Sequence, residues 1–138
     1  MSTLQQKVSI SAGSALLFFL LNLPATYRLT NYILPCNTVN PLTGCPTTTG
    51  LIIHASIFFV ITFLSMTSAS FNAGIKFKNS LYATVIFLLI ASPFMYSLTG
   101  SIFGESIATS KGCPTLLGVL IHSIVYGASL VGIMYLPL

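Results

Sequence analysis

Two stretches with one shared pattern decide how this chain is organised: "CPTTTGLIIHASI" at residues 45–57 and "CPTLLGVLIHSIV" at residues 113–125. Both begin with Cys-Pro-Thr and continue with a glycine, an apolar run and a histidine at the same spacing. The chain contains only two histidines, and they occupy equivalent places in these stretches. The shared positions are Cys45, Pro46, Thr47, Gly50 and His54 in the first stretch and Cys113, Pro114, Thr115, Gly118 and His122 in the second.

A second pair of matching stretches precedes the first pair: "FFLLNLPATYRLTNYI" at residues 18–33 and "FLLIASPFMYSLTGSI" at residues 87–102. Apolar residues match by chance in such segments, but proline, tyrosine and threonine do so far less often. The informative matches are Pro24, Tyr27 and Thr30 with Pro93, Tyr96 and Thr99. We therefore interpret the chain as a tandem duplication, with one unit at residues 1–70 and the other at 71–138, forming one compact membrane unit.

The composition predicts a membrane protein. Of 138 residues, 54% are hydrophobic and 4% are charged, whereas a soluble domain carries about a quarter charged residues. Four apolar stretches, at 8–29, 49–69, 79–102 and 115–136, each have the roughly 20 residues that a helix needs to cross a bilayer. Backbone groups in lipid must be satisfied within their own segment, which favours helices. The sequence predicts an all-α membrane protein whose four transmembrane helices form two tandem helical hairpins. The first stretch has no clear small-x-small cleavage site, so we expect it to be retained.

Prolines and glycines suggest how each hairpin is shaped. Pro24 and Pro93 fall inside the first and third predicted helices, where proline kinks the backbone. The Cys-Pro-Thr prolines stand near the starts of the second and fourth helices, where a missing N–H costs little. Gly50 and Gly118 are expected to allow close approach of a neighbouring helix.

The orientation of the chain follows from its repeats and its basic residues. Two crossings in each unit give both units the same orientation, with the pseudo-symmetry axis along the membrane normal. Lys7, Lys76 and Lys78 lie at one end, against Arg28 and Lys111 at the other. Basic residues favour the cytosolic side, so both termini are expected there, with the loops at 31–48 and 101–114 on the opposite side.

The two histidines allow more than one interpretation. Ionisable groups inside a membrane are functional candidates, and a pair of histidines between helices can bind haem or a metal, or relay protons. The alternative is a structural hydrogen bond from each histidine to a tyrosine, a threonine or a backbone carbonyl on its partner helix. Tyr27 and Thr30 are the expected partners of His54, and their repeat equivalents are those of His122. We favour the structural role.

The three cysteines also leave alternatives open. Cys36 and Cys45 lie in one loop, while Cys45 and Cys113 are the repeated pair and meet if the two units are related by an axis. A disulfide requires an oxidising compartment. The sequence does not choose between a Cys36–Cys45 bond, a Cys45–Cys113 bond and free thiols.

Several function classes lack support in the sequence. Glu105 is the only acidic residue, which disfavours carboxylate catalysis and hard-metal binding. There is neither a P-loop nor a dinucleotide fingerprint. The net charge of +4 reflects scarce acids rather than a basic patch, so no nucleic-acid partner is expected. We predict a protein that is not an enzyme and has no catalytic residue, cofactor or metal.

The combined phrase is Pro-x-x-Tyr-x-Leu-Thr, a loop, then Gly-Cys-Pro-Thr-x-x-Gly followed by three apolar residues and His. It resembles small multi-span virion membrane proteins, associated with minor capsid proteins, of large nucleocytoplasmic DNA viruses. In the first copy the phrase comprises Pro24, Tyr27, Leu29, Thr30, residues 44–47, Gly50 and His54; in the second it comprises Pro93, Tyr96, Leu98, Thr99, residues 112–115, Gly118 and His122.

The resemblance implies a structural component of a virion with an internal lipid membrane. Its partners would be the lipid bilayer, minor or major capsid proteins reached through exposed loops and termini, and sister copies. During assembly it would lie in a host endomembrane. Two other classes remain as hypotheses. A small transporter or channel would use parallel repeats and kinked helices, and a haem-binding membrane protein would use His54 and His122.

Overall fold

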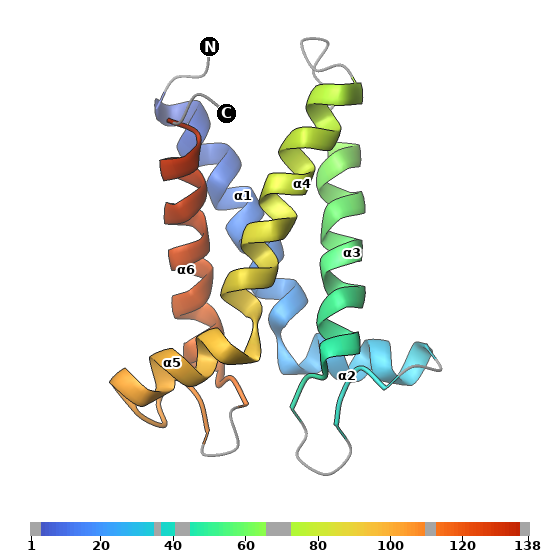
Figure 1. Ribbon diagram of the computed structural model, residues 1–138, viewed down its shortest axis with the longest axis vertical. Helices are drawn as coiled ribbons and strands as arrows, with labels where there is room; N and C mark the ends of the chain where they lie inside the picture. The colour runs from blue at the N-terminus through green and yellow to red at the C-terminus, as the bar shows by residue number, and fades with distance from the viewer. Residues whose placement is uncertain (1–3, 35–36, 41–44, 66–72, 110–112, 136–138) are drawn as a thin grey trace.

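The computed structural model describes residues 4–34, 37–40, 45–65, 73–109 and 113–135, and within them the regular structure is helical, with two isolated β-bridges in the connecting segments. The helices are α1 (Leu4–Asn22), α2 (Pro24–Ile33), α3 (Thr48–Ser65), α4 (Ala73–Ala91), α5 (Pro93–Phe103) and α6 (Leu116–Ile133). The four longer helices form a bundle, and α2 and α5 run sideways at one end of it (Figure 1). The boundary expected between the two units, at residues 70 and 71, lies outside the described residues.

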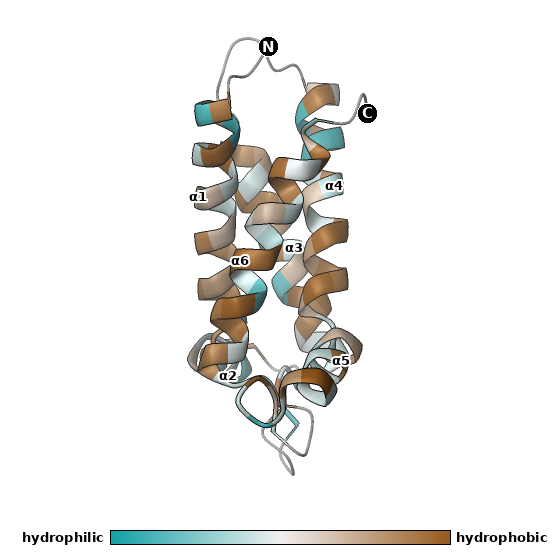
Figure 2. Ribbon diagram, turned by 90° about the vertical axis from the view of Figure 1, so that its left-hand side faces the viewer, coloured by the Kyte–Doolittle hydropathy of each residue, from teal (hydrophilic) through white to brown (hydrophobic). Residues whose placement is uncertain are grey.

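Three helices are long and apolar enough to cross a membrane, namely α3, α4 and α6, and the bent pair of α1 and α2 is a fourth candidate. Hydrophobic residues occur along the length of these helices (Figure 2), and many of them are exposed. Leu64 and Ile124, for example, are 68% and 64% exposed. Such a surface fits lipid and not water. The chain is therefore an all-helical protein with three to four candidate membrane-spanning helices.

The first and third predicted spans are each broken, which corrects the expectation of a kink within one helix. The axis of α2 is bent by 61° from that of α1. The chain turns at Leu23 and at Ser92, whose ψ angles of 139° and 149° are extended. A residue that precedes proline is pushed out of the helical region, while proline itself fits the first turn of a new helix. Each proline therefore starts a second helix, and the predicted spans at 8–29 and 79–102 both run across a break.

The long helices pack mainly between the two halves of the chain. α1 lies along α6, and α3 lies along α4, while the contacts of α1 with α3 and of α4 with α6 are less extensive (Figure 1). Lys7 of α1 also places its ammonium 3.7 Å from the ring centre of Tyr135, just after α6. A hairpin that packs on itself is therefore not the main unit of this fold, because each long helix finds its closest partner in the other half.

Four aromatic rings form the centre of the bundle, one from each long helix. Phe18, Phe58, Phe87 and Tyr126 are all completely buried. The ring centres of Phe18 and Tyr126 are 4.8 Å apart, as are those of Phe58 and Phe87. Aromatic pairs at such distances each contribute about 0.5–1.5 kcal/mol beyond their burial. The Tyr126 hydroxyl donates a hydrogen bond to the Ala83 carbonyl at 2.9 Å, so this polar atom is satisfied inside the core.

The two loops return to the bundle as short extended segments. Val39 forms a β-bridge with Pro46, and Ala108 forms the matching bridge with Pro114. Gly50 packs directly against the carbonyl of Thr38, and a Cβ there would overlap its oxygen. This corrects the expectation that the glycines admit a neighbouring helix, because their close neighbour is the loop backbone.

We predict that Gly118→Ala destabilises the protein, because its Cβ would overlap the Ile107 carbonyl oxygen. Overpacking of this kind costs about 1–3 kcal/mol. Gly132→Ala in the same helix meets no atom within 4 Å, so it is the matched control and should leave stability equal or slightly higher. Thermal unfolding in detergent, followed by circular dichroism, measures both variants. Equal melting temperatures for the two alanine variants would contradict the close contact.

Candidate functional site

His54 of α3 makes hydrogen bonds to the end of α1 and to α2. The Nδ1 atom of His54 lies 2.6 Å from the carbonyl oxygen of Leu21, and Nε2 lies 2.9 Å from the Thr30 hydroxyl. The His54 ring stacks on Tyr27, with ring centres 3.9 Å apart and an angle of 8° between the planes. His54 is completely buried. One histidine thus connects α3 to α1 and to α2.

The helix break explains why a histidine is needed here. The last carbonyls of a helix have no N–H donor within that helix, and Pro24 supplies no N–H of its own. Thr26 donates its hydroxyl to the Leu20 carbonyl at 2.5 Å, and Asn22 donates its side-chain amide to the Phe18 carbonyl at 2.8 Å. The bonds from His54 and Thr26 thus satisfy the carbonyls of Leu21 and Leu20, which the break leaves without an N–H donor in α1.

The second half contains the same arrangement. The Nδ1 atom of His122 lies 2.9 Å from the Ile90 carbonyl oxygen, and Nε2 lies 3.0 Å from the Thr99 hydroxyl. Its ring stacks on Tyr96 with centres 3.9 Å apart. Ser92, at the break, donates to the Leu89 carbonyl at 2.9 Å. We call each set of histidine, threonine, tyrosine and helix-end carbonyl a histidine lock.

The partners of each ring define its protonation. A carbonyl oxygen only accepts, so Nδ1 carries a proton; in a neutral ring Nε2 is then an acceptor, and the threonine hydroxyl is the donor within its reach. The expected hydrogen bonds to Thr30 and Thr99 are present, whereas the two tyrosines stack on the rings instead of bonding to them. Both nitrogens of each ring are thus engaged within the half of the chain to which they belong. Within the part of the chain that the structure describes, no three His, Cys, Asp or Glu residues are grouped for a metal ion.

The threonine of each Cys-Pro-Thr phrase fastens a loop to a helix start. Thr47 accepts a hydrogen bond from the Gly50 N–H at 3.0 Å and donates to the Asn37 carbonyl at 2.5 Å. Thr115 makes the same two bonds with Gly118 and Ser106. A threonine at this position caps the first turn of the helix. The phrase therefore sets where α3 and α6 begin and holds the preceding loop against them.

Cys45 and Cys113 form a disulfide that joins the two loops, with their Cα atoms 4.9 Å apart. The bond links positions separated by 68 residues, one from each half. Of the alternatives that the sequence left open, the structure contains the Cys45–Cys113 bond. Cys36 lies outside the described residues.

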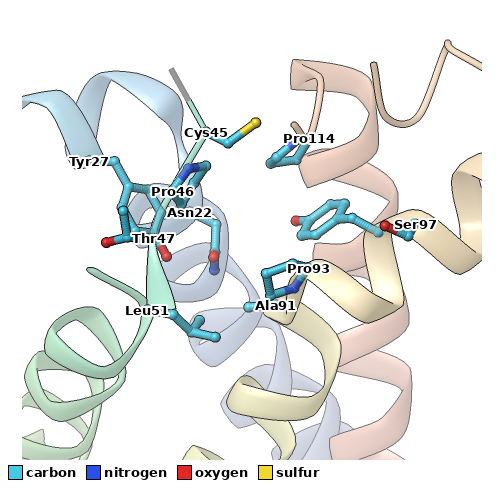
Figure 3. Close-up of a pocket in the computed structure, with 11 residues that line it drawn as sticks. Asn22, Tyr27, Cys45, Pro46, Thr47, Leu51, Ala91, Pro93, Ser97 and Pro114 are labelled. Carbon is cyan, nitrogen blue, oxygen red and sulfur yellow. The ribbon is translucent and has the colours of Figure 1, made fainter. Parts of the chain in front are cut away.

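A cavity of about 140 Å³ lies between the halves beside this disulfide. Figure 3 shows Tyr27, Asn22 and Leu51 on one side and Pro93, Ser97 and Pro114 on the other. Its remaining lining residues are Cys45, Pro46, Thr47, Ala91 and Tyr96. No charged side chain lines it. The buried Tyr96 hydroxyl has no hydrogen-bond partner among the described residues, and a cavity of this size has room for water, which can satisfy such a group.

Sequence reasoning singled out both histidines and allowed a backbone carbonyl as a partner, but it did not indicate which carbonyl each ring bonds to. The carbonyls of Leu21 and Ile90 belong to apolar residues, and no side-chain pattern marks them. Asn22 was likewise not predicted to bond at the helix end. Its position two residues before Pro24 is the signal that would have placed it at a helix end.

No protein-family model, curated protein or solved structure matches this chain.

We predict that His54→Phe leaves the bundle assembled but less stable, because the Leu21 carbonyl loses its donor. The expected cost is about 1 kcal/mol, typical of a hydrogen bond between membrane helices. Thr30→Val should cost a similar amount, and the double variant should cost less than the sum, since both remove one shared bond. Ser56→Ala is the control, because Ser56 is exposed and bonds only within α3. Additive effects in detergent melting would contradict the lock.

We predict that removing the disulfide lowers stability by about 2–4 kcal/mol, the usual contribution of such a bond. The double variant Cys45→Ser/Cys113→Ser should melt at a lower temperature than the parent chain, and reductant should have no further effect on it. Cys36→Ser serves as the control and should respond to reductant as the parent does. A parent chain whose melting is unaffected by reductant would rule this contribution out.

Proposed function

We propose that this chain is a non-catalytic structural protein of a membrane, built as a tandem pair of helical units and tied together at one end. The observation that carries the proposal is the Cys45–Cys113 disulfide, which joins the two loops at one end of the bundle (Figure 1). A covalent link between the halves suits a rigid scaffold and would oppose a motion that opens the halves at this end.

Repeated interactions support the tandem arrangement. Thr30 and Thr99 bond to their histidines at 2.9 and 3.0 Å, and the two tyrosine–histidine stacks have the same separation of 3.9 Å. These contacts involve the positions that match in the sequence. A duplication of one ancestral helical hairpin accounts both for the matching sequence positions and for the matching contacts.

The disulfide also bears on membrane orientation. Disulfides persist in oxidising compartments, so the loop end would face away from the cytosol. The starts of α1 and α4 lie at the opposite end (Figure 1), where Lys7, Lys76 and Lys78 give the basic bias of a cytosolic face. Two independent features thus favour cytosolic termini.

We propose that the membrane is the internal membrane of a large DNA virus virion, reached through a host endomembrane. The support is the resemblance of the Pro-x-x-Tyr and Gly-Cys-Pro-Thr phrases to virion membrane proteins. Capsid proteins or sister copies would contact the exposed loop end. Asn37, Glu105 and Ser106 are exposed there and provide polar groups for such a contact.

Fractionation of purified virions tests this proposal. The protein should be present in many copies and should stay with the lipid fraction after mild detergent. A carbodiimide, which joins carboxylates to amines, should link Glu105 to a neighbouring capsid protein or sister copy. Glu105→Gln is the matched control and should lose that link. Detection of the protein only in uninfected host membranes would end the proposal.

A small transporter or channel is the second candidate, and the cavity between the halves is the observation that favours it. The sparse polar lining and the covalent link between the loops disfavour it. Flux across reconstituted liposomes distinguishes the two functions. Permeation of ions or small solutes above that of protein-free vesicles would replace the scaffold with a transporter.

A further inference from the structure

The two short helices at the loop end leave the bundle in opposite directions. α2 and α5 both begin at a proline, and Figure 1 shows them extending to opposite sides, while Figure 2 shows them at the same level. With 10 and 11 residues, they reach about 15 Å sideways at the usual rise of a helix. We call them the wing helices.

The exposed side of α2 is apolar, and it lies opposite the loop. The Asn31 side-chain oxygen accepts a hydrogen bond from the Thr38 N–H of the loop at 3.1 Å. Leu29 and Ile33 are each two residues from Asn31, hence about 160° around the helix. Leu29 is 56% exposed and Ile33 is 65% exposed. The polar side of α2 therefore faces the loop, and the apolar side faces away from it.

The second wing has the same arrangement. Gly100 packs against Ala108 of the second loop, so that a Cβ on the glycine would stand 3.1 Å from the Ala108 Cβ. Leu98 and Ile102 flank Gly100 by two residues and lie about 160° away. They are 45% and 67% exposed, and Phe94, one turn before Leu98, is 73% exposed. The wing on α5 thus also presents an apolar face away from its loop.

We propose that the two wings lie in one leaflet, at the boundary of headgroups and acyl chains, and that the protein thereby favours membrane curved with the loop end on the convex side. An amphipathic helix binds in the plane of a membrane in this way, and its binding is sensitive to curvature. The wings add area to the loop-side leaflet alone. At the opposite end, the described residues contain the ends of the four long helices and no sideways helix.

The occupant of these apolar faces is lipid for a structural reason. Each wing follows a long helix after a single residue, Leu23 or Ser92, so a bilayer that surrounds the long helices must reach the wings. Arg28 is exposed on α2 between the loop side and the apolar side, a position from which it meets lipid phosphates. The inference rests on the membrane-spanning part of the proposed function and does not depend on a virion.

A membrane tube pulled from a giant vesicle provides the test. The full chain, labelled at its N-terminus, is reconstituted, and a non-permeant quencher outside leaves visible only molecules whose loop end points outward. These molecules should be denser on the tube than on the vesicle by roughly two- to threefold, because the tube is convex toward the loops. Equal density, or depletion from the tube, would overturn the proposal.

Matched variants distinguish enrichment caused by the wing helices from enrichment caused by the shape of the four-helix bundle. Leu29→Asn/Leu98→Asn makes both apolar faces polar and should reduce the tube-to-vesicle ratio to about one. Ser101→Asn, at an exposed position of α5, should leave the ratio at the parent value. An intact Cys45–Cys113 bond on a non-reducing gel verifies that each variant folds. A double variant that folds and still enriches would overturn the assignment to the wings. Because only lipid and protein are present, a failure here is independent of the virion test.

Discussion

The fold depends on satisfying the carbonyls that each proline exposes in the interior of the bundle. In lipid no water can bond to a helix end, and an unpaired polar group costs several kcal/mol, so a break is stable only if another group donates. His54 and His122 are those donors, each reaching sideways from the next long helix of its own half. This explains why Pro-x-x-Tyr-x-x-Thr and the histidine occur together in both halves. Proline makes the break, histidine pairs with the exposed carbonyl, and threonine and tyrosine hold the ring in place.

The broken helices also decide how the two halves fit together. Because α1 and α4 end at the breaks, the chain turns sideways before the loops return to start α3 and α6. The locks act within each half, whereas helix packing, the four central rings and the disulfide act between halves. Neither half alone contains all of the contacts that hold the bundle together. The two halves are thus joined by packing and by a covalent bond, which supports a scaffold over a protein whose halves must separate.

The sequence predicted the features that depend on residue type and spacing. Long apolar stretches gave the membrane helices, and the position of Thr30 and Thr99 one helix before the histidines gave their hydrogen-bond partners. The turn at Pro24 was expected to be a kink, because proline inside an apolar run is compatible with both a bent and a broken helix. The choice depends on whether a distant donor reaches the freed carbonyl, and that is a tertiary contact. For the same reason the loop backbone against Gly50 and the choice of Cys113 as the partner of Cys45 required coordinates.

The ring protonation of His54 and His122 tests the central claim most directly. Solid-state NMR of ¹⁵N-histidine-labelled protein in lipid bilayers distinguishes the two neutral forms from each other and from the charged ring. The account predicts two neutral rings, each protonated on Nδ1 and hydrogen-bonded through both nitrogens. Rings protonated on Nε2, or charged at neutral pH, would contradict it, since neither form can both donate to the helix-end carbonyl and accept from threonine.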